Sequence, residues 1–356
     1  MELIEREPQL KRLWKDWQDV EEGQGRVALI SGEAGIGKTS LVERFVKDLG
    51  PSVPVLHGAC DALFSPQPLG AFLEIAPRIG ANLPRLIQSG MDRLTFATEL
   101  YAYLQNSPTP VALVLEDLHW ADEATLDVVK YLGRRIQHTR ALFIATYRDD
   151  EIKRQHPLWF LLGDFPAALT ERIELPRLSP DAVQTLARRG GRMIGDLYEI
   201  TAGNPFFVTE VIATEGAGLP PSVRDAVLAR VARLSAEATS IVEVVALAPG
   251  AIDLALIDAV LHPNPAALDE CVERGILYQQ GSGLAFRHEL ARQSIEDSLP
   301  VGKLRALHGR ILAALQARES EPGVLTRLVH HAVRAGDGHL GTSCHVLNSP
   351  FPCERK

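Results

Sequence analysis

The residues best suited to chemistry lie in one short stretch near the N-terminus. Residues 32–39 read GEAGIGKT, which matches the pattern G-x-x-x-x-G-K-[ST] in full. Glycines let backbone N–H groups turn inward around phosphate oxygens, a lysine can bridge the outer phosphates, and a threonine hydroxyl can ligate Mg²⁺. The spacing therefore predicts a site for nucleotide phosphates, with ATP or ADP and Mg²⁺ as the ligands. The predicted contacts are Gly32, Glu33, Ala34, Gly35, Ile36, Gly37, Lys38, Thr39 and Ser40.

Two adjacent acidic residues follow a second apolar run. Residues 111–115 read VALVL, as expected for a strand buried on both faces, and Glu116 and Asp117 come directly after it. Ligands bind at the carboxyl ends of strands in open α/β sheets. We therefore predict that Glu116 joins Thr39 in the Mg²⁺ shell and that Asp117 orients the attacking water, and the order of these two roles stays open.

A third apolar run, residues 141–147, is followed by Arg148. In this position a guanidinium can meet the terminal phosphate and sense whether it is present. The alternative is a surface arginine paired with Asp149 or Asp150. Both interpretations stay open from the sequence.

The elements that must position these residues can also be read from the pattern. The run at 26–31 precedes the glycine-rich loop, and the helix after it ends at Gly50. Further strand candidates lie at 53–58 and 172–176. Five strands with helical connections predict an α/β P-loop NTPase with a doubly wound parallel sheet, over residues 1–178.

The rest of the chain reads as mostly helical. Ser179-Pro180-Asp181 has the residues of a helix start, and we expect a helical lid over 179–218. Helices and a hairpin around residues 281–283 predict a winged-helix-like domain over 219–290. Amphipathic helices over 291–338 suggest the start of a helical-repeat region. Residues 339–356 lose helical periodicity, and we expect a disordered tail.

Composition excludes several classes of protein. The 356 residues carry a formal net charge of −8, which argues against a chain whose main task is coating nucleic acid. The four cysteines lack metal-ligand spacing and are too few for a disulfide framework. The sequence has no apolar run of bilayer length and no signal-peptide pattern, so we expect a cytoplasmic protein without a membrane partner. His308, His330 and His331 share no helical face with acidic partners, and we interpret them as ordinary helix residues and not as metal ligands.

An ordered set of motifs carries a family resemblance over residues 1–338. The motifs are IEREPQLKRL, GEAGIGKTSL, LVLEDLHWADE, ATYRDDE, GNPFFVTEV and FRHELARQSIEDSL. Their order resembles the STAND-type signalling ATPases, specifically the AAA-like ATPase region of large bacterial LuxR-family transcriptional regulators of the maltose-regulator type.

This resemblance implies a nucleotide-dependent switch. The ADP-bound form would be closed and resting, and ATP, with an inducer or regulatory protein, would open it and drive self-association. The segment Ile4–Glu7 would lie near the adenine, and Pro205 would pack on the base. His288 would contact the β-phosphate, with a cap on the helix starting near Glu289 as the alternative.

The chain also departs from the family. It stops soon after the repeats would begin and has no recognisable helix-turn-helix at its end, so we expect a truncated or frame-shifted copy that does not bind DNA directly. Two other ATP-using classes remain as alternatives. One is a small-molecule kinase, and the other is a ring-forming motor or loader ATPase that would use Arg134 or Arg135 on a neighbouring subunit.

Overall fold

The computed structural model describes residues 3–61, 68–152, 154–191, 195–214, 219–248, 250–318 and 324–335. The chain divides into two compact units. The first comprises Met1–Met193 and Gly203–Val208, and the second comprises Ile194–Ala202 and Thr209–Lys356. The domain boundaries predicted at 178, 218, 290 and 338 stay predictions, and the expected tail at 339–356 lies outside the described residues.

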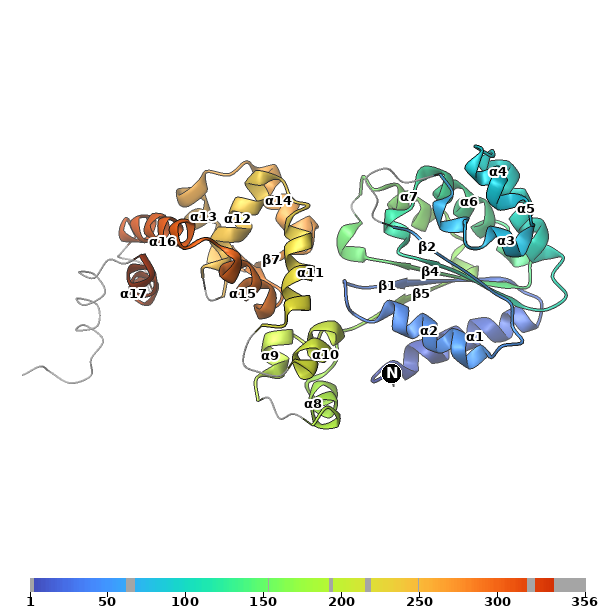
Figure 1. Cartoon of the computed structure of the whole chain (residues 1–356), viewed down its shortest axis with the longest axis horizontal. Helices are drawn as coiled ribbons and strands as arrows, with labels where there is room; N and C mark the ends of the chain where they lie inside the picture. The colour runs from blue at the N-terminus through green and yellow to red at the C-terminus, as the bar shows by residue number, and fades with distance from the viewer. Residues whose placement is uncertain are drawn as a thin grey trace, which may run out of the picture. The chain divides into compact units, whose positions relative to one another are not determined.

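The first unit is built on a five-stranded parallel sheet (Figure 1). Its strands are β1 (Arg26–Ser31), β2 (Val55–Ala59), β3 (Val111–Glu116), β4 (Ala141–Tyr147) and β5 (Thr170–Glu174). The spatial order is β2-β3-β4-β1-β5, so the strand before the glycine-rich loop lies inside the sheet. The α/β P-loop architecture and its five strands, predicted from the apolar runs, are confirmed.

Helices cover both faces of this sheet. Helices α1 (Glu7–Glu21) and α2 (Lys38–Leu49) lie on one face, and α5 (Arg93–Gln105), α6 (Glu123–Gly133) and α7 (Pro157–Asp164) lie on the other (Figure 1). Strand β3 shows how one run serves two cores: Ala112 and Val114 pack with α1 and α2, whereas Leu113 and Leu115 pack with the opposite helices. Burial on both faces explains why the strand sequences are continuously apolar.

Shorter elements complete the first unit. They are η1 (Gly70–Phe72), α3 (Ala76–Ile79), α4 (Leu83–Gln88), η2 (Leu118–Trp120), η3 (Ile136–His138), η4 (Asp149–Glu151), η5 (Ala167–Leu169) and α8 (Pro180–Arg189). Helix α8 begins as predicted, because the Ser179 side chain accepts a hydrogen bond from the N–H of Ala182. Helix α10 (Pro205–Ala213) starts in the first unit and ends in the second.

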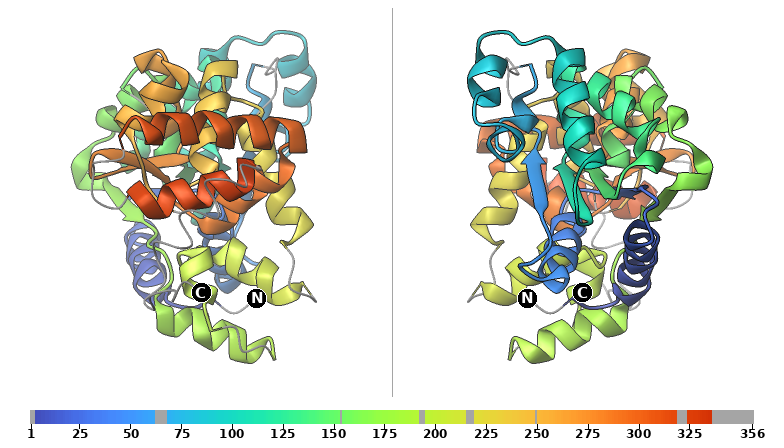
Figure 2. Two further views of the ribbon diagram at one scale, coloured as in Figure 1. Left: turned by 90° about the vertical axis from the view of Figure 1, so that its left-hand side faces the viewer. Right: turned by 90° about the vertical axis from the view of Figure 1, so that its right-hand side faces the viewer.

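The second unit combines helices with a small antiparallel sheet. Its elements are α9 (Leu197–Thr201), α11 (Pro221–Val231), α12 (Ala236–Ala246), β6 (Ile252–Asp253), α13 (Leu254–Leu261), α14 (Pro265–Glu273), β7 (Leu277–Gln280), β8 (Gly283–Phe286), α15 (Glu289–Ser298), α16 (Val301–Gln316) and α17 (Val324–Ala335). Strands β7 and β8 form the predicted hairpin, and Gly281 supplies its left-handed turn residue with φ of 60°. Helices α16 and α17 lie side by side (Figure 2, left).

Among the described residues, no helix has the length and apolar character that crossing a bilayer requires.

Candidate nucleotide-binding site

The glycine-rich loop has the backbone that its sequence predicts. Gly32, Gly35 and Gly37 all have positive φ, at 147°, 77° and 98°. Other residue types rarely adopt these conformations, so the glycines are needed to fold the loop. Gly37 caps the N-terminus of α2, and Lys38, Thr39 and Ser40 form its first turn. The loop therefore ends at a helix N-terminus, where backbone N–H groups and the helix dipole favour an anion.

Lys38 lies inside this loop. Its Nζ donates to the carbonyl oxygens of Gly32, at 2.6 Å, and Glu33, at 3.0 Å. The residue is only 8% exposed. Burial lowers the pKa of Lys38, and the positive charge of Arg148 acts in the same direction. The ammonium group is thus held at the loop by weak neutral acceptors, in a place where a phosphate would supply the missing negative charge.

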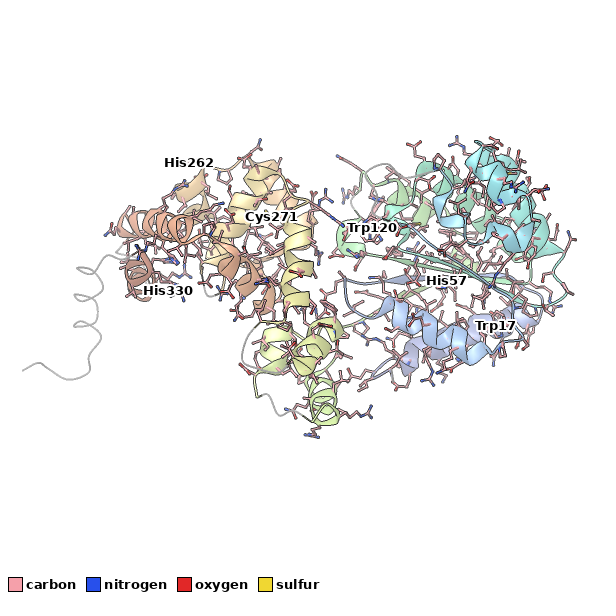
Figure 3. All side chains as sticks on the ribbon, in the orientation of Figure 1. Trp17, His57, Trp120, His262, Cys271 and His330 are labelled. Atoms are coloured by element: carbon pink, nitrogen blue, oxygen red, sulfur yellow. The ribbon has the colours of Figure 1, made fainter. Side chains whose placement is uncertain are left out.

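The residues predicted to hold Mg²⁺ meet each other. The Thr39 hydroxyl donates to Glu116 Oε2 at 2.5 Å, and His57 Nε2 lies 2.8 Å from Glu116 Oε1 (His57 is labelled in Figure 3). Burial opposes ionisation of Glu116, but the hydrogen bonds of His57 and Thr39 outweigh it, and the pKa of Glu116 lies below its ordinary value. A hydroxyl and an ionised carboxylate are ligands that Mg²⁺ prefers, so this pair fits the ion.

Asp117 differs from its neighbour in backbone and environment. It adopts a left-handed conformation, with φ of 52°, and its N–H donates to Thr146 Oγ1 at 3.0 Å. Burial raises the pKa of Asp117, while Arg148 and Lys38 act in the opposite direction. The sharp turn after β3 thus directs the two carboxyl groups differently. The Glu116 carboxylate accepts the hydrogen bond of Thr39, which favours Glu116 as the Mg²⁺ ligand and Asp117 as the group that orients water.

Arg148 follows β4 and is held by two contacts. Its Nη1 donates to Glu151 Oε1 at 2.5 Å, and its guanidinium carbon lies 4.6 Å from the ring centroid of Trp120. The side chain is 17% exposed. The ion pair with Glu151 differs from the predicted surface alternative with Asp149 or Asp150. The charge acts on both Lys38 and Asp117, and the role of Arg148 as a phosphate sensor stays a prediction.

The segment at Gly203–Phe206 contacts the glycine-rich loop. Asn204 Nδ2 donates to Glu33 Oε1, at 2.9 Å, and to the carbonyl oxygen of Ala34, at 3.0 Å. The N–H of Phe206 donates to the carbonyl oxygen of Gly35 at 3.2 Å. Asn204 is 1% exposed, and its partners Glu33 and Ala34 are partly buried. Pro205, which lies between these two contacts, is the first residue of α10. Its packing on the base stays a prediction.

Two arginines that the sequence patterns did not single out also bind this region. Arg177 Nη2 donates to Glu33 Oε2 at 2.8 Å. Arg6 Nη2 donates to the carbonyl oxygens of Ile36, at 3.1 Å, and Pro176, at 2.9 Å, and the residue is 2% exposed. The N-terminal segment Ile4–Glu7 is thus anchored next to the loop, while its predicted proximity to adenine stays a prediction.

The remaining predicted residues have other surroundings. His288 belongs to the second unit, where its Nδ1 lies 3.1 Å from the carbonyl oxygen of Thr201. It makes no side-chain cap on α15, so the cap interpretation is wrong, and the β-phosphate contact stays a prediction. Arg134 pairs with Asp164 at 3.5 Å, and Arg135 stacks on Tyr131 at 3.9 Å.

We expect Asn204→Ala to weaken both the first unit and its nucleotide binding. The change removes two partly buried hydrogen bonds, to Glu33 Oε1 and to the carbonyl oxygen of Ala34. Their loss should lower the free energy of unfolding by about 1–3 kcal/mol. Urea unfolding and calorimetric ATP titration would measure the two effects. Asn106→Ala, at an exposed helix end, is the control and should change neither. Equal results for the two variants would contradict a supporting role for Asn204.

Comparisons with known proteins show what this chain is similar to. A family model described as AAA ATPase domain matches residues 2–144, which is less than half of the chain. The chain is 23% identical to a protein of Rhizobium meliloti (strain 1021) described as uncharacterized, over 94% of this chain and 39% of that protein. The chain thus spans about two fifths of the length of this curated relative.

Among the solved structures that match, the first described below supports the same fold. The Walker-type ATPase of Pyrococcus abyssi superposes with a TM-score of 0.56 at 13% identity, over 82% of this chain and 96% of that one. A STAND protein with a tetratricopeptide repeat sensor from Pyrococcus horikoshii gives a TM-score of 0.37 at 19% identity, over 94% of this chain and 49% of that one. The family match, the glycine-rich loop and the parallel sheet together define an AAA-like nucleotide-binding ATPase domain.

Proposed function

We propose that this chain is a nucleotide-dependent signalling switch of the STAND type. ATP produces the active form, slow hydrolysis returns it to an ADP-bound resting form, and an inducer or regulatory protein biases the exchange. In this proposal Lys38 binds the outer phosphates, and Thr39 and Glu116 hold Mg²⁺. The ion would neutralise charge on the phosphates, Asp117 would orient the attacking water, and Arg148 would sense the terminal phosphate.

One observation carries the proposal. The loop that would hold phosphate is hydrogen-bonded to Asn204 and Phe206, and these residues lie at the start of α10. The same helix continues into the second unit from Thr209 onward. A change in the loop on exchange of ADP for ATP would therefore act directly on the segment that leads into the second unit. A site built only for turnover has no need of this connection.

Finer parts of the proposal follow from the motif order. The second unit contains a winged-helix-like domain, which is supported by helices α11 to α14 followed by the β7–β8 hairpin. Helices α16 and α17 begin a helical-repeat region, and the ATP-bound form self-associates. The relation to LuxR-family transcriptional regulators rests on the motifs alone. A small-molecule kinase and a ring-forming motor remain alternatives, and turnover separates them from a switch.

We expect the full chain, purified gently and without added nucleotide, to retain ADP. Turnover should lie well below the roughly 1–100 per second typical of kinases, because a switch must keep its signal longer than a catalytic cycle. Chromatography of the released nucleotide and a phosphate-release assay measure both quantities, and sedimentation with a non-hydrolysable ATP analogue measures self-association. Turnover in the kinase range with phosphate transfer to a small acceptor would contradict the proposal.

A further inference from the structure

Three histidines that look unrelated in the sequence come together in the second unit. His308 lies on α16, and His330 and His331 lie on α17. One ring nitrogen from each histidine lies within 4.8 Å of a nitrogen from each of the other two. The ring centroids are separated by 5.0 to 5.9 Å. Helices α16 and α17 lie side by side (Figure 2, left), and this packing gathers histidines that the sequence analysis interpreted as ordinary helix residues.

The polar atoms of these rings are not satisfied by hydrogen bonds alone. His308 and His331 approach each other through their Nδ1 atoms, at 2.8 Å. The Nε2 atoms of His308 and His330 are buried without a hydrogen-bond partner among the described residues. His308 is 0% exposed, so bulk water does not solvate its ring. A native protein rarely leaves two buried ring nitrogens unpaired in one cluster, and a bound ion is an ordinary explanation.

The tautomer of His330 is suited to metal binding. The carbonyl oxygen of Leu247 accepts a hydrogen bond from this ring, and because Nε2 is unpaired the donor must be Nδ1. The lone pair therefore lies on Nε2. A histidine that donates one N–H to a backbone carbonyl and presents its other nitrogen to an ion is a common arrangement at metal sites.

The surroundings leave room for an ion and limit its type. A cavity of about 120 Å³ adjoins His330 and His331 and is lined by Ala248, Ile252 and Arg327 among others. The nearby carboxylate of Glu296 pairs with both Arg292 and Arg334, and so offsets positive charge without joining the cluster. Three neutral nitrogens suit zinc, copper, nickel or cobalt, whereas Mg²⁺ and Ca²⁺ need oxygen ligands.

We propose that His308, His330 and His331 form a binding site for a divalent transition-metal ion of the zinc class, which joins α17 to α16. Zinc–nitrogen bonds of about 2.0–2.1 Å in a tetrahedral site place ligand nitrogens about 3.4 Å apart. The ligand nitrogens now lie within 4.8 Å of one another, so binding would change their separations by about 1 Å. Water from the cavity completes the shell. The site is independent of the nucleotide site and of the switch proposed above.

Zinc titration of the full, untagged chain tests this proposal after removal of metal by a chelator. We expect one Zn²⁺ per chain by calorimetry, and a rise in melting temperature on adding zinc chloride. His330→Gln should weaken the binding by about 100-fold, because one of three ligands is lost. The matched control is His262→Asn, at an exposed left-handed position that asparagine tolerates, and it should bind zinc as the unchanged chain does (Figure 3 labels both histidines).

A second measurement does not depend on any variant folding. X-ray absorption of the zinc-loaded, unchanged chain should show three nitrogen ligands at about 2.0 Å, with imidazole scattering. Sulfur in the shell would assign the zinc to a cysteine instead, and a shell of oxygens would indicate a surface site. Either result, or an equal loss of affinity in the His330 and His262 variants, overturns the proposal.

Discussion

Replacing Lys38 with alanine is expected to abolish ATP and ADP binding while the chain stays folded. The loop holds this lysine through the carbonyl oxygens of Gly32 and Glu33. In the proposed complex it bridges two phosphates. Each hydrogen bond to a charged group contributes about 1.5–3 kcal/mol, so losing two weakens binding by about 100-fold or more.

The fold should tolerate this change because Lys38 does not support the core. In the part of the chain that the structure describes, its ammonium group donates to the loop carbonyls of Gly32 and Glu33, and burial disfavours its charge and lowers its pKa. Unfolding of the variant without nucleotide should therefore occur near the midpoint of the unchanged chain. What should disappear is the stabilisation by nucleotide, which for a ligand at 100 times its Kd is about 2.7 kcal/mol.

Calorimetric titration and thermal unfolding, each with and without ATP, measure these effects. Lys47→Ala is the matched control, because Lys47 is exposed in the last turn of the same helix. It should bind ATP normally. Unchanged ATP affinity in Lys38→Ala would remove the assignment of the glycine-rich loop, and with it the proposed switch.

The sequence predicts those parts of the site whose residues form a contiguous pattern along the chain. The loop from Gly32 to Thr39 has a fixed spacing, and the strands β1, β3 and β4 are continuous apolar runs that only a doubly covered sheet can bury. The acidic pair Glu116 and Asp117 can be predicted because it directly follows the apolar residues of β3. Local patterns therefore suffice for the loop, the sheet and the carboxylates.

The parts that the sequence does not predict depend on tertiary contacts between distant residues. Asn204 and Arg177 bind Glu33 across 171 and 144 positions, and nothing near any of the three residues marks the pairing. The burial of Arg6 is not predicted by the sequence either, since a charged residue before an amphipathic helix normally faces water. Its burial becomes apparent only when the carbonyl oxygens of Ile36 and Pro176 are placed around it.

The histidine cluster was missed for a related reason. Adjacent residues such as His330 and His331 point about 100° apart around a helix, so neither periodicity nor spacing suggests that they share a site. The packing of α17 against α16 sets that arrangement. A pattern within one helix cannot predict which face of a second helix will meet it.

Replacing Asp117 with asparagine is expected to stop hydrolysis and leave ATP binding largely intact. Asparagine has nearly the same shape and tolerates the left-handed backbone that Asp117 adopts, at φ of 52°. The backbone hydrogen bond to Thr146 Oγ1 is also unaffected. What is lost is the negative charge that would orient the attacking water. Groups in this role contribute about 10²–10⁴-fold, so hydrolysis should fall within that range.

Glu116→Gln should have the opposite profile. Glu116 accepts the hydrogen bond of Thr39 and pairs with His57, so a neutral amide at this position weakens the predicted Mg²⁺ shell. Binding of ATP in the presence of Mg²⁺ should weaken, while binding without Mg²⁺ should change little. This dependence on the ion separates a metal ligand from a residue that only supports the fold.

Measuring both variants decides which carboxylate has which role. Phosphate release and calorimetric ATP titration, each with and without Mg²⁺, would be applied to Asp117→Asn, Glu116→Gln and the exposed control Asp225→Asn. If Asp117→Asn loses Mg²⁺-dependent binding and Glu116→Gln loses only hydrolysis, the two roles are reversed. The hydrogen bond between Thr39 and Glu116 favours Glu116 as the Mg²⁺ ligand and Asp117 as the group that orients water. The Thr39 hydroxyl is itself a predicted Mg²⁺ ligand, and the hydrogen bond places the Glu116 carboxylate beside it.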